Sequence, residues 1–188
     1  MKRRSFLRKV ARIAIDRLVF LDEAGLNCSM TRSHAWVKRG SEYEERVPMN
    51  WGKNLTLIGA IRLRGWVTLG TMFATANRER FVRWLRTRLL PKLCRGDVLI
   101  MDNATAHHAP QVATLCKAAG VRLLYLPPYS PDFNPIEPGW ALQKQHVRKH
   151  APRDPRALRR VARRARYRVT KRHCRNWFAH AGYRARPN

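Results

Sequence analysis

The stretch VLIMDNATAHH, residues 98–108, places an aspartate, Asp102, directly after four apolar residues. A short apolar run that ends in polar residues is typical of a strand buried on both faces of a sheet. Downstream, a short helix is expected to begin near Pro110, and residues 121–126 form a second apolar run. Because a strand, a helix and a strand in succession favour parallel pairing, this region predicts the parallel part of an α/β sheet.

The segments upstream predict an antiparallel part of the same sheet. Residues 18–21 are apolar and lead to Asp22, which predicts a short strand with the aspartate at its tip, stopped by the Ala-Gly pair that follows. Residues 55–63 and 66–73 are rich in apolar and β-branched residues and are separated by Arg-Gly, which predicts a hairpin. Residues 36–37 are expected to form a further short strand.

Two helices are predicted from apolar residues that recur at helical spacing. The first follows Asn77, which is a suitable N-terminal cap, and ends near Pro91. The second begins at about Pro138, since proline is favoured at a first helical position, and runs to about His150. The prolines within residues 152–155 then break the chain.

An arginine-rich segment follows this break. Apolar residues from Leu158 to Val169 mark one face of a helix, and the opposite face has no acidic residue. That face is either solvated or in contact with a DNA backbone, and we favour DNA because phosphates relieve the repulsion between the arginines. The arginines are Arg156, Arg159, Arg160, Arg163, Arg164, Arg166 and Arg168.

The composition supports a polyanionic partner. Of 188 residues, 39 are Lys or Arg and 12 are Asp or Glu, which gives a formal charge of +27, while 45% are hydrophobic, enough for one sizeable core. Nucleic acid is the expected partner, and an anionic membrane surface is the alternative. No run of eighteen apolar residues occurs, so no membrane span is predicted, and we expect the protein in the cytosol or on the nucleoid.

Cysteine and tryptophan add little to the function. The four cysteines lie far apart with no Cys-x-x-Cys pair, so they indicate neither a zinc site nor a disulfide framework. The tryptophans form no periodic stripe and are expected to pack in the core. They are Trp36, Trp51, Trp66, Trp84, Trp140 and Trp177.

Three acidic residues stand at the ends of predicted elements. Asp22 and Asp102 end strands, and Glu137 begins a helix. If the first and fourth strands are neighbours, the three carboxylates converge and repel one another unless cations bind them. Oxygen ligands favour Mg²⁺ or Mn²⁺, and two such ions can clamp a phosphoryl group. Each acid alone also has a plainer interpretation, as a turn former, a cap or a favourable charge at a helix N-terminus.

Polar residues beside these acids are candidates for supporting roles. Asn103 and His107 follow Asp102 and would orient a metal ligand or touch a phosphate, or else only cap the next helix. Glu23 is expected to point to the opposite side of the strand and is left out of the acid cluster.

The proline-rich stretch at residues 127–135 predicts a stiff loop that fixes the direction of Glu137. Asn134 is expected to hydrogen-bond within this loop. Tyr129 either packs on the protein or stacks on a base.

Four stretches together resemble the DDE transposases, specifically the bacterial insertion-sequence branch of the mariner superfamily. They are FLDEAG (20–25), WGKNLTLIGA (51–60), MDNATAHH (101–108) and YLPPYSPDFNPIE (125–137). There are 34 residues between Asp102 and Glu137, the separation of the family's second and third acids. The resemblance covers about residues 17–183.

The resemblance implies a fold and a chemistry. The expected fold is a ribonuclease H-like mixed sheet over residues 1–151, with three antiparallel strands, then parallel strands, and flanking helices, and a basic helical extension of the same domain over residues 152–188. The implied triad is Asp22, Asp102 and Glu137, binding two Mg²⁺ or Mn²⁺ ions. The implied activity is cutting of element ends in DNA and attack of the freed 3′-hydroxyl on target DNA, without a covalent enzyme intermediate.

One departure from the family limits this expectation. Family members ordinarily carry N-terminal helix-turn-helix modules that recognise the element ends, and few residues precede the first predicted strand here. We therefore expect a separate helix-turn-helix polypeptide as a partner and a homodimer when two ends are brought together. The alternatives are a non-catalytic DNA-binding remnant of a transposase and, less compatible with the acids, a basic RNA-binding protein.

Overall fold

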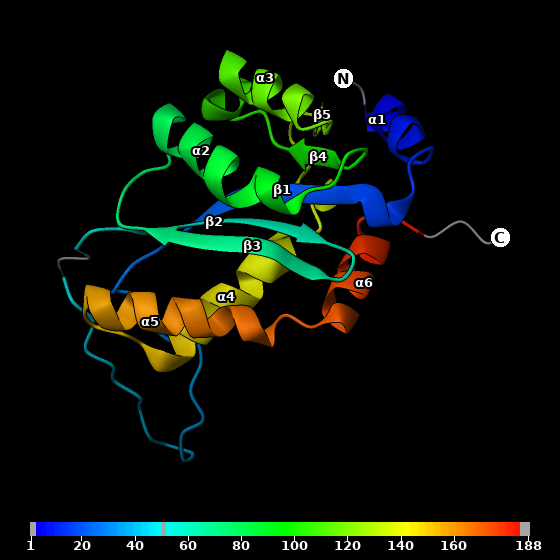
Figure 1. Ribbon diagram of the computed structural model, residues 1–188. Helices are drawn as coiled ribbons and strands as arrows, with labels where there is room; N and C mark the ends of the chain where they lie inside the picture. Colours follow the sequence, from blue (N-terminus) through cyan, green and yellow to red (C-terminus); the bar gives the residue numbers. More distant parts are fainter. Residues whose placement is uncertain (1–2, 50–51, 185–188) are drawn as a thin grey trace.

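The computed structural model describes residues 3–49 and 52–184, which build a five-stranded sheet with helices on both faces (Figure 1). The order of the strands is β3-β2-β1-β4-β5. β1, β2 and β3 pair antiparallel, and β4 and β5 continue the sheet parallel to β1, as predicted. The strands are β1 (Leu18–Leu26), β2 (Leu55–Arg62), β3 (Gly65–Met72), β4 (Val98–Met101) and β5 (Arg122–Tyr125).

The first strand is longer than the sequence predicts. β1 does not stop at Ala24 and Gly25, because these residues pair with Leu57 and Thr56 of β2 and so remain in the ladder. Asp22 therefore lies inside the strand and not at its tip. On the other side of β1, the parallel pairing with β4 ends at Phe20, which lies opposite Ile100. Beside Asp22, β1 is therefore no longer paired with β4.

The segment between β1 and β2 departs from two expectations. Residues 36–37 form no strand, and the side chain of Trp36 is fully exposed instead of packed in the core. Residues 27–49 form neither a helix nor a strand, so this segment offers no packed face that would bury the tryptophan. Trp84 and Trp140 are buried as predicted. Trp51, also expected in the core, lies outside the described residues.

The helices divide between the two faces of the sheet (Figure 1). Residues of α2 and α3 pack with the odd-numbered side chains of β1, such as Val19 and Leu21, in one core cluster. Residues of α1, α4, α5 and α6 pack with the even-numbered side chains, such as Phe20, in a second. The helices are α1 (Arg3–Val10), α2 (Arg78–Trp84), α3 (Pro110–Ala118), α4 (Glu137–His150), α5 (Pro155–Ala165) and α6 (Lys171–His180).

Several predicted helix boundaries are confirmed. Asn77 caps α2, since its side chain accepts a hydrogen bond from the backbone N–H of Arg80. The helix at Glu137 carries Pro138 in its first turn and ends at His150, before Ala151 adopts a left-handed conformation with φ of 41°. These caps and stops are local, so the sequence reveals them.

The C-terminal segment consists of two helices where the sequence predicted one. α5 ends at Ala165, and Arg166–Arg168 form a 3₁₀ turn before α6. Both helices bury apolar side chains, among them Leu158 and Phe178, in the same core cluster as β1. α1 was not predicted either, because its basic residues conceal the buried Phe6 and Val10. Within the described ranges, no helix combines the length and the apolar character that a membrane span requires.

Candidate active site

Three acidic side chains from separate elements line one pocket. Asp22 comes from β1, Asp102 follows the last residue of β4, and Glu137 is the first residue of α4. The pocket has a volume of about 410 Å³, and the loop from Leu126 to Pro131 forms another of its walls. Asp22 is buried, Asp102 is partly exposed and Glu137 is exposed. We call this cavity the acid pocket.

Asp22 is held by three hydrogen-bond donors. Its Oδ1 accepts from the backbone N–H of Glu23 at 2.8 Å. Its Oδ2 accepts from Asn134 Nδ2 at 3.1 Å and from Trp140 Nε1 at 3.3 Å. The expectation that the Asn134 side chain bonds within its own loop is therefore wrong. Both donors come from the segment around Glu137, so the third acid and the supports of the first belong to one stretch of chain.

Burial controls the ionisation of Asp22. Removal from water, together with the nearby charges of Glu137, Glu23 and Asp102, raises the pKa of Asp22 to about 7, against the opposing hydrogen bond from the backbone of Glu23. The three acids thus repel one another electrostatically, and the negative charges around Asp22 are not fully neutralised by the protein.

Gly59 makes room for the Trp140 indole. It lies directly opposite Asp22 in the ladder between β1 and β2. A Cβ atom at this position would stand 3.0 Å from Trp140 Cη2 and 2.9 Å from atoms of Leu69 and Trp66. Such contacts are too short, so only glycine allows Trp140 to reach the carboxylate of Asp22 without a rearrangement.

Asp102 contacts a buried histidine that also contacts Glu23. His107 Nδ1 lies 2.7 Å from Asp102 Oδ1, and His107 Nε2 lies 3.2 Å from Glu23 Oε1. Burial by itself would lower the pKa of His107, but the hydrogen bonds and charges of Asp102 and Glu23 raise it to about 10. The hydrogen bond from His107 in turn lowers the pKa of Asp102. The imidazolium therefore bridges two carboxylates at neutral pH.

Glu23 makes a contact that no sequence pattern indicates. Its side chain does lie on the face of the sheet opposite to Asp22, as expected, and there it contacts His107. The Asn103 side chain does not reach Asp102, because its Nδ2 donates to the backbone oxygen of Leu126 at 2.6 Å. Asn103 thus joins the chain after β4 to the end of β5.

The side chains of the acid pocket offer ligand atoms of the type that a hard cation such as Mg²⁺ prefers. All its candidate ligands are oxygens, and Asn134 Oδ1 is buried with no hydrogen-bond partner. Within residues 3–49 and 52–184, however, no three His, Cys, Asp or Glu side chains stand close enough together to hold an ion as they are placed. The exposed Glu137 is the acid with the greatest freedom to turn.

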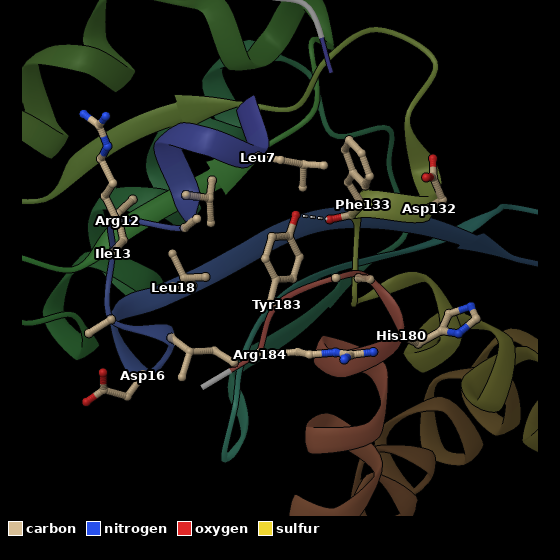
Figure 2. Close-up of a pocket in the computed structure, with 16 residues that line it drawn as sticks. Leu7, Arg12, Ile13, Asp16, Leu18, Asp132, Phe133, His180, Tyr183 and Arg184 are labelled. Atoms are coloured by element: carbon tan, nitrogen blue, oxygen red, sulfur yellow. Dashed lines mark hydrogen bonds between the residues drawn. The ribbon is translucent and has the colours of Figure 1, made fainter. Parts of the chain in front are cut away.

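A larger pocket lies elsewhere and has a different lining. Figure 2 shows it between α1, the start of β1 and the end of α6, with a volume of about 860 Å³. Its wall is mainly apolar, with side chains such as Leu7 and Phe133, and the hydroxyl of Tyr183 is bonded to the backbone oxygen of Phe133 at 2.6 Å. The carboxylates at its rim, Asp16 and Asp132, do not belong to the acid pocket, so the smaller pocket is the better candidate for chemistry.

A second region with functional chemistry is the exposed face of α5 and the turn after it. All seven arginines predicted to contact DNA are exposed, and we call them the arginine surface. The guanidinium of Arg159 lies 4.5 Å from the ring centre of Phe73, and that of Arg166 lies 4.5 Å from the ring centre of Tyr167. With these two aromatic residues, six of the arginines line a groove of about 440 Å³. The residues of the surface are Arg156, Arg159, Arg160, Arg163, Arg164, Arg166 and Arg168.

Comparison with known proteins places this arrangement in a family. Residues 17–159, more than half of the chain, match the model of the DDE superfamily endonucleases. The chain belongs to the DDE endonuclease superfamily. The matched range includes all three acids of the pocket and the first part of the arginine surface. No curated protein sequence matches the chain.

Solved structures show the same fold as this DDE superfamily chain. The Mos1 transposase paired-end complex with the left transposon end matches with a TM-score of 0.77 and 17% identity, covering 95% of this chain and 56% of that one. The Mos1 strand transfer complex matches with a TM-score of 0.70 and 20% identity over 95% and 55%. The catalytic domain of Mos1 mariner transposase matches with a TM-score of 0.66 and 15% identity over 95% and 83%.

These likenesses confirm the predicted ribonuclease H-like fold, a mixed sheet with flanking helices. The chain spans about half the length of the transposase chains in the two Mos1 DNA complexes.

Proposed function

We propose that this chain is the catalytic domain of a transposase, which cuts DNA at element ends and joins the freed strand to target DNA with two Mg²⁺ or Mn²⁺ ions. The observation that carries the proposal is the lining of one pocket by Asp22, Asp102 and Glu137, from three separate elements, in a member of the DDE endonuclease superfamily.

The chemistry of the pocket supports a divalent cation. Its ligands would be the carboxylates of the three acids, and Asn134 Oδ1 offers a further oxygen without a partner. Mos1 mariner paired-end complexes have been solved with Mn and with Mg. When bound, the cations would neutralise the scissile phosphate and the attacking and leaving oxygens of the displacement.

The protein side chains have distinct tasks in this proposal. Asn134 and Trp140 fix the direction of the Asp22 carboxylate, and His107 fixes that of Asp102. Glu137 makes no side-chain hydrogen bond within the described ranges, so it would be free to turn toward the other acids and complete the ligand set of a cation. The chemistry then depends on positioning and charge neutralisation.

The arginine surface supplies the proposed contact with the DNA backbone. Seven exposed arginines on one side of α5 and its following turn match the negative charge of the phosphates. Such contacts give affinity that falls with salt but no choice of sequence. Recognition of the ends by a helix-turn-helix partner, a homodimer that brings two ends together and residence on the nucleoid belong to the same proposal.

A nicking and strand-joining assay tests the proposed activity. Supercoiled plasmid and oligonucleotide DNA are incubated with Mg²⁺ or Mn²⁺ and with the native chain, Asp102→Ala or Asp16→Ala. Asp16 lies at the rim of the larger pocket and outside the acid pocket. Asp16→Ala is therefore the control, because it removes one carboxylate, as Asp102→Ala does, but not from the proposed site. We expect cutting by the native chain and by Asp16→Ala, and a loss of roughly a hundredfold or more in Asp102→Ala.

A non-catalytic DNA-binding remnant is the second candidate. The present positions of the acids favour this second candidate, since in the described part of the chain their three carboxylates do not converge on one cation position. If both the native chain and Asp102→Ala bind DNA equally and neither cuts it with either metal, this second function holds and the first is wrong.

A further inference from the structure

Tyr129 projects into solvent from a strained backbone at the rim of the acid pocket. Its side chain is 100% exposed, and its φ is 50°, in the left-handed region that bulky residues rarely adopt. Glycine or asparagine would fit this backbone at a lower energy. Within the described ranges, its ring and hydroxyl contact no other side chain that would repay this strain.

The loop beneath Tyr129 is held in place by hydrogen bonds. Ser130 is buried, and its Oγ donates to the backbone oxygen of Pro128 at 3.0 Å. Arg3 Nη1 donates to the same Oγ at 2.9 Å, and the Arg3 guanidinium also pairs with Asp132. The exposed ring thus stands on a fixed support, which lowers the loss of conformational entropy when it binds a flat partner.

The ring of Tyr129 lies where the proposed DNA substrate would bind. Tyr129 lines the same pocket as Asp22, Asp102 and Glu137. A phosphate bound at these acids brings its own nucleotide to the rim of the pocket. Aromatic side chains at such positions bind bases by stacking, which is sequence-tolerant because every base has a flat π face.

We infer that Tyr129 is a stacking platform for the base next to the scissile phosphate. The inference rests on the proposed function and adds a substrate contact to it.

The other fully described exposed tyrosine near a functional surface differs in this respect. Tyr167 is 73% exposed, but Arg166 covers its ring at 4.5 Å and donates to its hydroxyl at 2.5 Å. Tyr167 therefore already has a partner within the protein, whereas Tyr129 does not. Because Tyr167 also lines the arginine groove, the matched control for loss of an exposed tyrosine ring is Tyr43→Ala; Tyr43 is 49% exposed and lines neither the acid pocket nor that groove.

Photocrosslinking tests the contact directly. Nicked DNA duplexes that carry 5-iodouracil beside the nick are irradiated with the native chain in Ca²⁺, which is used to hold the DNA uncut, and the crosslinked peptide is identified by mass spectrometry. We expect the crosslink at Tyr129, and its loss in Tyr129→Leu. A crosslink of equal yield in Tyr129→Leu would overturn the inference.

Kinetics and stability then separate substrate contact from a structural role. We expect Tyr129→Ala to cut DNA about tenfold more slowly or worse, since stacking of one base contributes about 1–3 kcal/mol, and Tyr129→Phe and Tyr43→Ala to cut at nearly the native rate. Tyr129→Gly should melt at a higher temperature than the native chain, because it relieves the backbone strain, and yet cut as slowly as Tyr129→Ala.

The outcomes for the two proposals are distinguishable. If the native chain never cuts DNA with Mg²⁺ or Mn²⁺, the proposed function is wrong, and the crosslink still decides whether Tyr129 contacts a base. If the native chain cuts and Tyr129→Ala cuts equally fast, the inference on Tyr129 is wrong and the proposed function stands. If Tyr129→Ala changes only the oligomeric state measured by sedimentation, the ring contacts protein and not DNA, which also overturns the inference.

Discussion

The acid pocket and the arginine surface carry opposite charges, and they are built in different ways. In the acid pocket, Asp22 has partners from a distant part of the chain, Asn134 and Trp140. Asp102 has the nearby His107, which is itself paired with Glu23 on β1. The arginine surface consists of exposed side chains from consecutive turns of one segment. Buried charges depend on their partners for stability, whereas exposed charges are screened by water. Single substitutions should therefore have large effects in the pocket and small ones on the surface.

The largest effect on stability is expected from His107→Ala. His107 is buried between Asp102 and Glu23, and we expect its loss to lower the free energy of unfolding by about 3 kcal/mol near neutral pH. Because the pKa of folded His107 is raised to about 10, its charge stabilises the fold fully below pH 6.5 and ceases to do so as the pH rises through 10. Urea unfolding at both ends of this range measures the effect.

The exposed neighbour His108 provides the control for this prediction. His108→Ala should change the free energy of unfolding little at any pH. A difference between the native chain and His107→Ala that stays constant through pH 10 would show that the imidazole only fills space and that its charge is unimportant.

The next largest effect is expected from Gly59→Ala. The added methyl group would collide with Trp140, Trp66 and Leu69, and overpacking of this kind lowers stability by about 1–3 kcal/mol. Displacement of the indole also removes a hydrogen bond from Asp22, so the DNA cutting rate should fall by more than the loss of folded protein explains. Thermal denaturation and cutting kinetics on the same samples measure both.

Gly25→Ala is the matched change in the same ladder, since a Cβ there meets nothing within 4 Å. It should leave both stability and cutting near the native values. Equal loss of activity in the two variants would mean that any side chain added to this ladder disturbs the site. The loss in Gly59→Ala could then not be assigned to displacement of Trp140.

A smaller effect is expected from pH on cation binding. Burial raises the pKa of Asp22 to about 7, so below this pH a cation must displace a proton from the carboxyl group. The affinity for Mn²⁺ should rise about tenfold per pH unit up to about 7 and then level off. Titration calorimetry at several pH values measures this, and Asp22→Ala should bind weakly without the same slope. An affinity that does not change below pH 7 would contradict the role of Asp22 as a ligand.

The smallest effect is expected from a single change on the arginine surface. Arg163→Ala should alter the free energy of unfolding by less than about 0.5 kcal/mol, because the side chain is exposed. It should weaken DNA binding and lower the salt slope by about 1, the value for one phosphate contact. Fluorescence anisotropy at several salt concentrations measures the slope. An unchanged slope in this variant and in Arg160→Ala would indicate that these arginines are only solvated.

The elements that could be predicted from the sequence are those with local signals. The hairpin of β2 and β3, the cap at Asn77 and the start of α4 at Glu137 depend on residues within a few positions of one another. The length of β1 could not be predicted, because the residues after Asp22 stay in the strand only through pairing with β2. α1 was missed for a similar reason, since its two buried residues are stabilised by a distant core.

The candidate site shows the same division. The three acids could be proposed from their positions at element ends and from the spacing of the family motifs, but their supports could not. Trp140 lies three residues after Glu137 on α4, so the two side chains are close in sequence. The hydrogen bond of Trp140 nevertheless goes to Asp22, on a distant strand. The partner of His107 beyond Asp102 is Glu23, which follows Asp22 on β1 but points to the opposite face of the sheet.

By itself, the sequence determined the hairpin, the parallel strands, the helix caps, the excess of basic charge and the candidates for the acids, because periodicity, caps and charge are properties of neighbouring residues. Only the tertiary structure decided which acid is buried, which donors hold it and which aromatic ring stays in solvent. Those properties arise from contacts between residues more than a hundred positions apart, such as Asp22 and Asn134, and the free energy of such contacts exists only after the sheet and helices have packed.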